Sequence, residues 1–554
     1  MSILLNLLKW SVRGLIVLVA LLSCLLVVLY IGAQQYPEPG GEPLNKLLLT
    51  NVTVIDVKSG ELLPERAIRI QDGKITGIEP ASTAEAMGGE TTRDMRGAYA
   101  MPGMWDMHAH LGHFALYTAA PVTAMNGVLY VRELGSDCLG QGCAFGQTIE
   151  ESRMIQRWAE QGTILSPIFS ELASFHIAGR RKGYDGRYGY PREPAYLVPT
   201  TAAEGARLVE HIADRGLDFI KTYNSVEPEA YRAMLQSASQ KTLYIGGHVP
   251  RGISLVEAVT TGHRSVEHAR QLPIACSPLG MEYVTAYGDW ASSEDERDAP
   301  PLDKRYADIV ASYDPALCDE VITQWAAVDS YYVPTHITRR AEAVVHTREY
   351  ESDPRLKYVP DAVVSTSWAN QAESYGEQFS EFPEDGQAYY DFFEHTVQLT
   401  GRAYRGGVKV LLGTDVGDML VYPGFSFVEE AMTFADGGIP NADILRIATL
   451  DAAVFSGMAE EHGSIESGKA ANLFFVASNP LEDISALADI TALYYQGAFY
   501  DEAAREAVLA EAAENAAGAT FYLRHTWHFL DGIIKGLGAD HAGDSEPLTV
   551  HPGL

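Results

Sequence analysis

The sequence predicts an α/β protein in which a (β/α)8 TIM-like barrel is combined with a small β-sandwich domain and one N-terminal transmembrane helix. Three observations support this prediction. An apolar stretch opens the chain, short strands alternate with helical stretches through its middle, and alternating β patterns stand on both sides of that middle region. The chain has 554 residues, and a barrel alone takes about 250 residues or more.

The composition is that of a globular protein. Hydrophobic residues make up 47% of the chain and charged residues 21%, which excludes a disordered, collagen-like or coiled-coil protein. Lys and Arg total 41 against 73 Asp and Glu, so the formal net charge is -32. Because a surface of this charge repels phosphate groups, we expect no nucleic-acid partner.

The N-terminal segment determines the expected compartment. Residues 14–33 carry no charge, and a helix of this length crosses the hydrocarbon core of a membrane. Lys9 and Arg13 precede it, so the positive-inside rule leaves residues 1–13 as a cytoplasmic stub and sends the remainder into the periplasm. A cleaved signal peptide is the alternative, but it calls for a shorter apolar region and small residues before the cut. We expect a single-pass anchor and then a linker over 34–46.

The remaining chain divides by its hydrophobic pattern. Alternating β-branched runs over 47–98 predict a small antiparallel unit. Over 99–459, eight strand candidates alternate with helical stretches, which predicts a closed barrel of parallel strands. The β pattern returns over 460–500, and these strands are expected to rejoin the first unit in one composite sandwich. Residues 501–554 form a helical tail that could rest on the membrane, dock on the barrel or pack on a second subunit of a homo-oligomer.

Side chains that can bind a metal end most of the predicted barrel strands. His108 and His110 lie two residues apart at the end of the first strand, so both imidazoles face the same side. The fourth, fifth, sixth and eighth strands end in Lys221, His248, His268 and Asp415. Barrels place their chemistry at the carboxyl ends of the strands, so these six residues predict a metal site at one rim.

Lys221 is unusual in this set because a protonated ammonium has no lone pair for a metal. A buried lysine can lose its proton, and the neutral amine can then add carbon dioxide to become an anionic carbamate. Such a carbamate would bridge two divalent ions at the roughly 3.5 to 4 Å spacing of two-metal sites. An ion pair with a neighbouring acid is the alternative role for Lys221.

The segments that carry these residues, in order, are MPGMWDMHAH, FIKTY, GGH, SVEH and LLGTD. They resemble the amidohydrolase superfamily, and more narrowly its imidazolonepropionase-like and prolidase-like members. The resemblance extends from about residue 47 to residue 499. It implies two metal ions bridged by the carboxylated lysine, with the other ligands divided as His108, His110 and Asp415 on one ion and His248 and His268 on the other.

The resemblance implies a metal-dependent hydrolase that cleaves an amide, peptide or cyclic amide C–N bond of a small molecule, and the N-terminal segment is expected to anchor this hydrolase in a membrane. A metal-bridging hydroxide would attack the carbonyl, and Asp415 would accept its proton and pass it to the leaving group. Zinc is the ion that histidine-rich ligation favours. Two alternatives stay open. One is a deaminase with a single metal, against which Lys221 argues, and the other is a non-catalytic anchored binding or sensor protein.

Four further residues are candidates for substrate binding. Tyr223 lies two residues after the lysine and should point into the same mouth. His176 and His336 follow the third and seventh strands, and Arg180 lies in a glycine-rich loop. Arginine suits a carboxylate, and the prolidase-like resemblance implies a dipeptide or an N-acyl amino acid as substrate. A structural role is the alternative for each of the four.

Four cysteines lie in the part expected to be exported, and an even number allows disulfides in an oxidising compartment. We expect bridges between Cys138 and Cys143 and between Cys276 and Cys318, with four free thiols as the alternative. The second bridge would tie the region after the sixth strand to the helix before the seventh. Two long stretches, 278–330 and 344–395, exceed ordinary connecting loops and could form a lid over the site.

Overall fold

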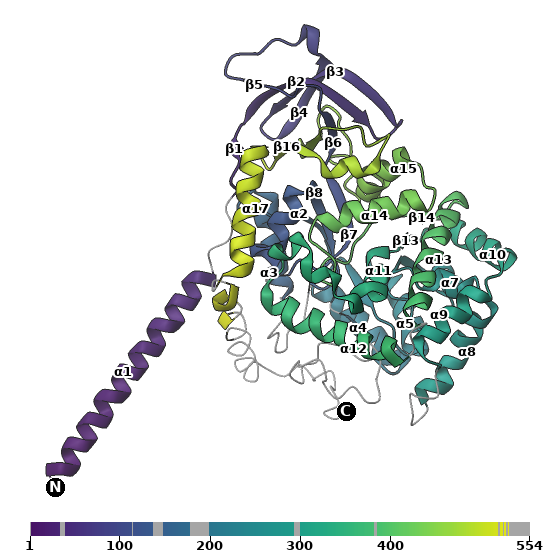
Figure 1. Ribbon diagram of the computed structural model, residues 1–554, viewed down its shortest axis with the longest axis horizontal. Helices are drawn as coiled ribbons and strands as arrows, with labels where there is room; N and C mark the ends of the chain where they lie inside the picture. The colour runs from purple at the N-terminus through teal and green to yellow at the C-terminus, as the bar shows by residue number, and fades with distance from the viewer. Residues whose placement is uncertain are drawn as a thin grey trace.

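The computed structural model describes most of the chain between the N-terminal helix and the C-terminal tail. The described residues are 2–33, 39–112, 115–136, 148–174, 176–177, 199–292, 300–381, 385–518, 521–524, 526–527 and 530. They form a mixed α/β body from which one long N-terminal helix projects (Figure 1).

Helix α1 (Ser2–Ala33) is the projecting element in Figure 1. Its segment Val12–Ile31 has 20 residues, is strongly apolar, and leaves nearly all of its side chains exposed. This length and composition suit a membrane span, and a signal sequence near an N-terminus has the same properties.

The β patterns at the two ends of the body meet in one nine-stranded sheet. Its strands are β1 (Glu42–Pro43), β2 (Lys46–Asp56), β3 (Glu61–Gln71), β4 (Lys74–Pro80), β5 (Thr91–Asp94), β6 (Tyr99–Pro102), β15 (Leu473–Val476), β16 (Ile490–Tyr495) and β17 (Ala498–Asp501). The order is β1-β17-β16-β15-β6-β2-β3-β4, with β5 beside β2. The antiparallel pair β15 and β6 joins the two parts of the chain, with Leu473 opposite Pro102.

Eight further strands all pair in parallel. A three-stranded sheet contains β7 (Met104–Ala109), β8 (Val128–Glu133) and β9 (Ile168–Leu172). A five-stranded sheet contains β10 (Phe219–Thr222), β11 (Tyr244–Gly247), β12 (His263–Glu267), β13 (Tyr331–Val333) and β14 (Lys409–Val410). Isolated parallel bridges connect the two sheets at both edges, from Ala173 to Phe219 and from Ala109 to Val416. Most of these residues are buried, as expected for parallel strands covered on both faces.

Helices follow most of these strands and cover the parallel sheets. Local signals explain where several of them begin. The side chains of Thr148 and Thr201 each accept a hydrogen bond from the backbone N–H three residues later and so form capping boxes at the start of α3 and α4. Three helices begin with proline. The bounds are α2 (Ala119–Met125), α3 (Ile149–Glu160), α4 (Ala202–Asp214), α5 (Pro228–Ala238), α6 (Leu255–Thr260), α7 (Gln271–Ala275), α8 (Pro278–Ser292), α9 (Leu302–Ala311), α10 (Pro315–Ala326), α11 (His336–Val344), α12 (Ala369–Glu381), α13 (Asp385–Arg405), α14 (Phe425–Asp436), α15 (Asn441–Arg446), α16 (Ala452–Phe455) and α17 (Glu502–Ala517).

The two long stretches expected to form a lid are largely helical. The first, 278–330, contains α8, α9 and α10, and the second, 344–395, contains short turns, α12 and the first half of α13. Helices α9, α12 and α13 share an aromatic cluster, in which the Tyr306 and Phe392 rings stack at 3.9 Å and Tyr375 lies 5.8 Å from Tyr389. Because the cluster joins both stretches, they fold as one packed unit.

A disulfide joins Cys276, at the end of α7, to Cys318 in α10, with a Cα–Cα distance of 4.3 Å. It is the second of the two bridges expected from the sequence, and it ties the predicted region after β12 to the helix before β13. Cys138 and Cys143, like Arg180, lie outside the described residues.

The described part of the C-terminal tail docks on the body. Helix α17 buries Val508, Leu509 and Ala512 and packs against α2. Beyond it, the guanidinium of Arg524 lies 3.6 Å from the centre of the Tyr117 ring. Of the three roles expected for the tail, docking on the α/β body is therefore the one that its described residues show.

Candidate metal centre

Two histidines and one aspartate converge at the carboxyl end of β7. Asp415 Oδ1 lies 3.3 Å from His108 Nε2 and 3.1 Å from His110 Nε2. One potential ligand atom from each of the three lies within 4.8 Å of the others. Imidazole nitrogens and a carboxylate oxygen are the donors that zinc and similar ions take in proteins, so the chemistry of this set fits a divalent cation.

The loop after β14 brings Asp415 to this point. Its backbone N–H donates to the His108 carbonyl at 2.7 Å, and the preceding Thr414 N–H donates to Asp106 Oδ1 at 2.9 Å. Asp415 has a φ of 65° and His268 has a φ of 67°. Both values lie in the left-handed region of backbone conformation, which residues other than glycine rarely adopt. Such strained conformations persist only where the surrounding structure holds them in place, and they are found most often at functional sites.

Lys221 lies against the same cluster from β10. Its Nζ atom is 3.1 Å from His108 Nε2, and the side chain is buried. Gly247 on β11 makes room for it: a Cβ there would lie 2.8 Å from Lys221 Cδ and 2.5 Å from the Thr222 carbonyl oxygen. Burial lowers the pKa of Lys221 to about 8, which brings the neutral amine within reach near physiological pH.

His248 and His268 form the second part of the cluster. Their ring centres are 4.5 Å apart, and the His268 ring lies 4.7 Å from that of His108. His248 Nδ1 lies 2.7 Å from Asn224 Oδ1, and His268 Nδ1 lies 2.8 Å from Thr335 Oγ1. Burial lowers the pKa of both imidazoles well below the ordinary value, so both are neutral and can offer a lone pair to a metal.

A buried carboxylate behind the cluster orients His108. Glu267 accepts from His108 Nδ1 at 2.8 Å and from Ser265 Oγ at 2.7 Å, and it forms an ion pair with Arg132. Burial alone would raise the pKa of Glu267, but the Arg132 charge and the contacts with His108 and Lys221 together outweigh burial and lower that pKa to about 2. A carboxylate bound to Nδ1 fixes the tautomer that leaves Nε2 free to face a metal.

Two of the expected substrate-binding residues lie beside these ligands. The Tyr223 ring stacks on His248 at 4.2 Å and on His176 at 5.1 Å, and His176 lies 5.6 Å from His110. The structure thus brings Tyr223 and His176 to the predicted mouth, where each could contact a substrate.

His336 is not brought to the cluster. Its side chain is fully buried, with Nδ1 at 2.8 Å from Glu430 Oε1 and Nε2 at 2.9 Å from Thr400 Oγ1. Because both ring nitrogens already have hydrogen-bond partners, the arrangement favours a structural role for His336. The seventh strand ends at Val333, and α11 begins at His336 and turns this side chain towards α14.

Sequence reasoning missed the residues that support the ligands. Glu267 stands inside the SVEH segment, where an acid in a buried strand was the available signal. Asp106 stands inside MWDMHAH in the same way.

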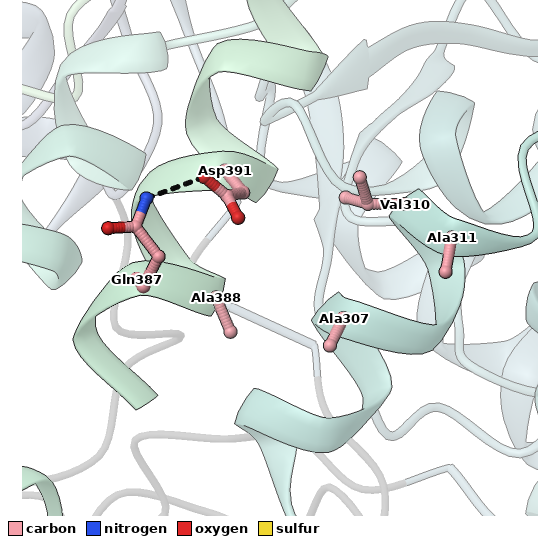
Figure 2. A pocket seen from close by; sticks show the side chains of 6 residues that line it. All are labelled: Ala307, Val310, Ala311, Gln387, Ala388 and Asp391. Atoms are coloured by element: carbon pink, nitrogen blue, oxygen red, sulfur yellow. Dashed lines mark hydrogen bonds between the residues drawn. The ribbon is translucent and has the colours of Figure 1, made fainter. Parts of the chain in front are cut away.

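One surface pocket of about 380 Å³ lies away from these residues, between α9 and α13. Figure 2 shows its lining, where Gln387 Nε2 donates to Asp391 Oδ1 at 2.7 Å. The lining residues are Ala307, Val310, Ala311, Gln387, Ala388 and Asp391. None is a candidate ligand, so this pocket is separate from the cluster.

Comparison with protein families matches residues 394–499 to the amidohydrolase family. The ochratoxinase of Aspergillus niger is 23% identical over 204 residues, a match that covers 30% of this chain and 42% of that relative. The chain thus spans less than half the length of the curated relative that it matches.

Solved structures match over much more of the chain. Bottromycin amidohydrolase is 19% identical with a TM-score of 0.62, covering 89% of this chain and 93% of its own. A Xaa-Pro dipeptidase with bound methionine is 20% identical with a TM-score of 0.55, covering 82% and 100%. The A. niger ochratoxinase structure is 18% identical with a TM-score of 0.51, covering 83% and 96%. Together with the family match, these folds confirm the resemblance to the amidohydrolase superfamily.

Proposed function

We propose that this chain is an amidohydrolase that uses two divalent metal ions to cleave an amide, peptide or cyclic amide C–N bond of a small molecule. The observation that carries the proposal is the convergence of His108, His110 and Asp415 with the buried Lys221 at one rim. The similar bottromycin amidohydrolase and Xaa-Pro dipeptidase are, by their names, enzymes that act on C–N bonds.

We further propose that the eight parallel strands form one closed barrel. The bridges at Ala173 and Ala109 support closure, because they connect both edges of the three-stranded sheet to the five-stranded one. In this arrangement, residues 99–459 form the barrel, and 47–98 with 460–500 form the composite β domain. The ligand-bearing ends of the strands would then surround a single mouth.

The donor set supports two ion positions. His108, His110 and Asp415 would hold one ion, His248 and His268 the other, and Lys221 as a carbamate would lie between them. Zinc suits these donors. When bound, the ions would polarise the substrate carbonyl and lower the pKa of a water molecule towards neutral pH.

The lowered pKa of Lys221 favours carboxylation of its side chain. Its Nζ must be neutral to form an N–C bond with carbon dioxide, and the product then loses a proton to become an anion. With a pKa of about 8, roughly a tenth of the amines are neutral at pH 7. At the ordinary value of 10.5, only about one in three thousand would be.

Asp415 would carry the proton of the reaction. The pKa of its carboxyl lies well below the ordinary value, because contacts with His108, His110 and His268 together outweigh the effect of burial. It therefore starts as the base, accepts a proton from the attacking water at one carboxylate oxygen, and donates it to the leaving nitrogen. His176 and Tyr223 are placed to position the substrate.

We also propose that α1 anchors the enzyme in a membrane, with the catalytic region in the periplasm. Lys9 and Arg13 before the apolar segment support this orientation, and the Cys276–Cys318 disulfide is consistent with an oxidising compartment. A periplasm-active reporter fused after Leu554 should give a signal. Activity from a cytoplasm-active reporter alone would overturn this orientation.

Metal analysis and turnover test the proposed chemistry. The purified chain should contain about two metal ions and hydrolyse members of a panel of dipeptides, N-acyl amino acids and lactams. Lys221→Ala should lose the second ion and the activity, with partial rescue by short carboxylic acids. Lys409→Ala removes a half-exposed lysine that pairs with Asp329 and should change neither, so it serves as the control.

Two results would redirect the proposal. A single tightly bound ion that survives Lys221→Ala would favour the mononuclear deaminase. Full metal loading without turnover on any amide would favour a non-catalytic binding or sensor protein.

A further inference from the structure

A helical segment beyond α17 attaches the C-terminal tail to the body by one of its faces. We call residues 521–524, 526 and 527 the tail segment. Phe521 and Arg524 are buried, and because they lie three positions apart, they share one face of the helix, the inner face. The Arg524 guanidinium lies over the ring of Tyr117, in the connection that leads from β7 to α2. The inner face therefore docks on the connection that follows a strand bearing candidate ligands.

The outer face of the tail segment is apolar and exposed. Tyr522 leaves 48% of its surface accessible and Leu523 leaves 37%, and a spacing of four places Trp527 beside Leu523. Among the described residues outside α1, the other large apolar side chains with this degree of exposure are isolated in the chain: Leu62, Met87, Tyr390, Met432 and Val454. An adjacent exposed pair of this kind is typical of a surface that contacts a membrane or another protein.

The tail segment also touches the end of the N-terminal helix. The centre of the Trp527 ring lies 5.2 Å from that of Tyr30, and the two rings meet edge to face. Tyr30 is the next-to-last residue of the apolar segment Val12–Ile31, and its neighbour Leu29 is buried although nearly all of that segment is exposed. In Figure 1 the yellow end of the chain lies beside the end of α1 that is nearest the body. The tail segment is therefore at the level where α1 would leave a membrane.

A phospholipid surface is the partner that fits the outer face. Tyrosine and tryptophan are enriched at membrane–water interfaces, because each ring has an apolar body and a polar tip. Tyr30, Tyr522 and Trp527 bring three such rings to one end of the apolar segment. The contact with Tyr30 makes the outer face continuous with α1, which favours lipid over a partner protein. Because the formal net charge of -32 opposes binding to anionic lipids, the contact is apolar and suits a zwitterionic surface.

We propose that Tyr522, Leu523 and Trp527 form a membrane-contact surface that seats the catalytic body on the periplasmic face of the lipid bilayer. The inner face of the tail segment holds the body and the outer face rests among the lipid headgroups, so the two contacts use different side chains. Through Arg524 and Tyr117, the surface fixes which side of the body faces the membrane, and that side carries the connection after β7. This inference rests on the proposed anchoring by α1 and adds a second, independent contact with the bilayer.

Photo-crosslinking of the full-length protein tests this surface. The photoreactive residue p-benzoylphenylalanine replaces Tyr522 or Leu523, one at a time, and the protein is reconstituted into phosphatidylcholine nanodiscs. Tyr390 on α13, with 42% of its surface accessible, receives the same probe as the matched control. Transfer of the exposed parts of Tyr522 and Leu523 from water to lipid favours the seated orientation by about tenfold. Mass spectrometry should therefore find about tenfold more lipid adduct at 522 and 523 than at 390.

A charge on the outer face should remove the contact. Leu523→Asp places a carboxylate where the headgroup region would receive an apolar side chain, so the adduct yield at position 522 should fall by about tenfold. Met432→Asp adds the same charge at an exposed position of α14 and should leave that yield unchanged. Thermal unfolding of each variant establishes that it is folded. If folded Leu523→Asp keeps the full adduct yield at 522, the inference is wrong.

The same probe at Val19, inside the apolar segment of α1, separates the contact surface from the anchor. Lipid adducts at 19 but not at 522 or 523, or equal yields at 522, 523 and 390, would leave the anchor standing and overturn the contact surface. Adducts at 522 and 523 without any at 19 would support the surface and refute the anchor, and none at any position would overturn both. Crosslinks from 522 to a second copy of the chain in place of lipid would show that a protein covers the outer face, which also overturns the inference.

Discussion

Replacing Glu267 by glutamine tests whether the carboxylate behind His108 orients a metal ligand. The side chains of Glu267, His108 and Arg132 are all fully buried. Glutamine has nearly the same shape, and its carbonyl oxygen can still accept from His108 Nδ1. It removes the negative charge, however, and its amide N–H group must face either Arg132 or the imidazole.

Two magnitudes follow from this geometry. Removing one partner of a buried ion pair leaves the Arg132 charge uncompensated, which costs about 3–5 kcal/mol of unfolding free energy. Loosening the hydrogen bond that orients a metal-binding histidine lowers metal affinity by about 10- to 100-fold. The second effect corresponds to about 1.4–2.8 kcal/mol of binding free energy.

Glu430→Gln is the matched control for this experiment. Glu430 is equally buried and accepts from His336 Nδ1 at 2.8 Å, but His336 is not part of the metal cluster. Urea denaturation of the metal-free proteins measures stability, and titration against a competing chelator measures metal affinity. We expect both variants to lose stability and only Glu267→Gln to lose metal affinity.

Two outcomes would refute the reasoning. If Glu267→Gln binds metal as tightly as Glu430→Gln does, Glu267 does not position His108. If its unfolding free energy matches that of the wild type, the ion pair with Arg132 does not contribute as its burial indicates.

Three further predictions concern the reaction, the disulfide and pH. Asp415→Asn should keep most of its metal but lose turnover by about 10²- to 10⁴-fold, because an amide cannot accept the proton; near wild-type turnover with full metal would contradict that role. Replacing Cys276 and Cys318 together by alanine opens a loop with a sequence separation of 42. This should lower the unfolding free energy by about 4 kcal/mol in urea, and an unchanged midpoint would argue against it. Burial lowers the pKa of His263 from 6.5 to about 4, so the unfolded chain takes up its proton first. The contribution of neutral His263 to the unfolding free energy is fully present above pH 6.5. As the pH falls from 6.5 to 4, the unfolding free energy decreases by up to about 3 kcal/mol. His263→Asn should flatten the stability curve over that range, and an equally steep curve would count against this assignment.

The convergence of the candidate ligands could be predicted because it depends on local pattern. His108, His248 and His268 each stand at the end of a short apolar strand, and parallel strands place such ends at one edge. Lys221 was identifiable for the same reason, and the Gly247 that makes room for it was visible in the GGH segment.

The supporting contacts could not be predicted because they depend on how distant strands meet. Glu267 reaches Arg132 across 135 positions of the chain, and no local pattern specifies that register. His336 depends on tertiary structure in the same way: it follows the parallel strand β13, but the start of α11 turns it towards Glu430.

The left-handed backbone conformation of His268 and Asp415 lowers the stability of the fold while placing two side chains in the candidate site. His268 and Asp415 hold φ angles of 67° and 65°, a conformation that glycine adopts at far lower cost. Each such residue costs about 1–3 kcal/mol that the neighbouring packing must offset. Glycine at either position would relax the backbone and also remove a candidate metal ligand. Selection for thermostability alone should therefore favour glycine at these two positions and produce variants without activity. Any programme to stabilise the protein should therefore leave the rim untouched and work on the nine-stranded sheet.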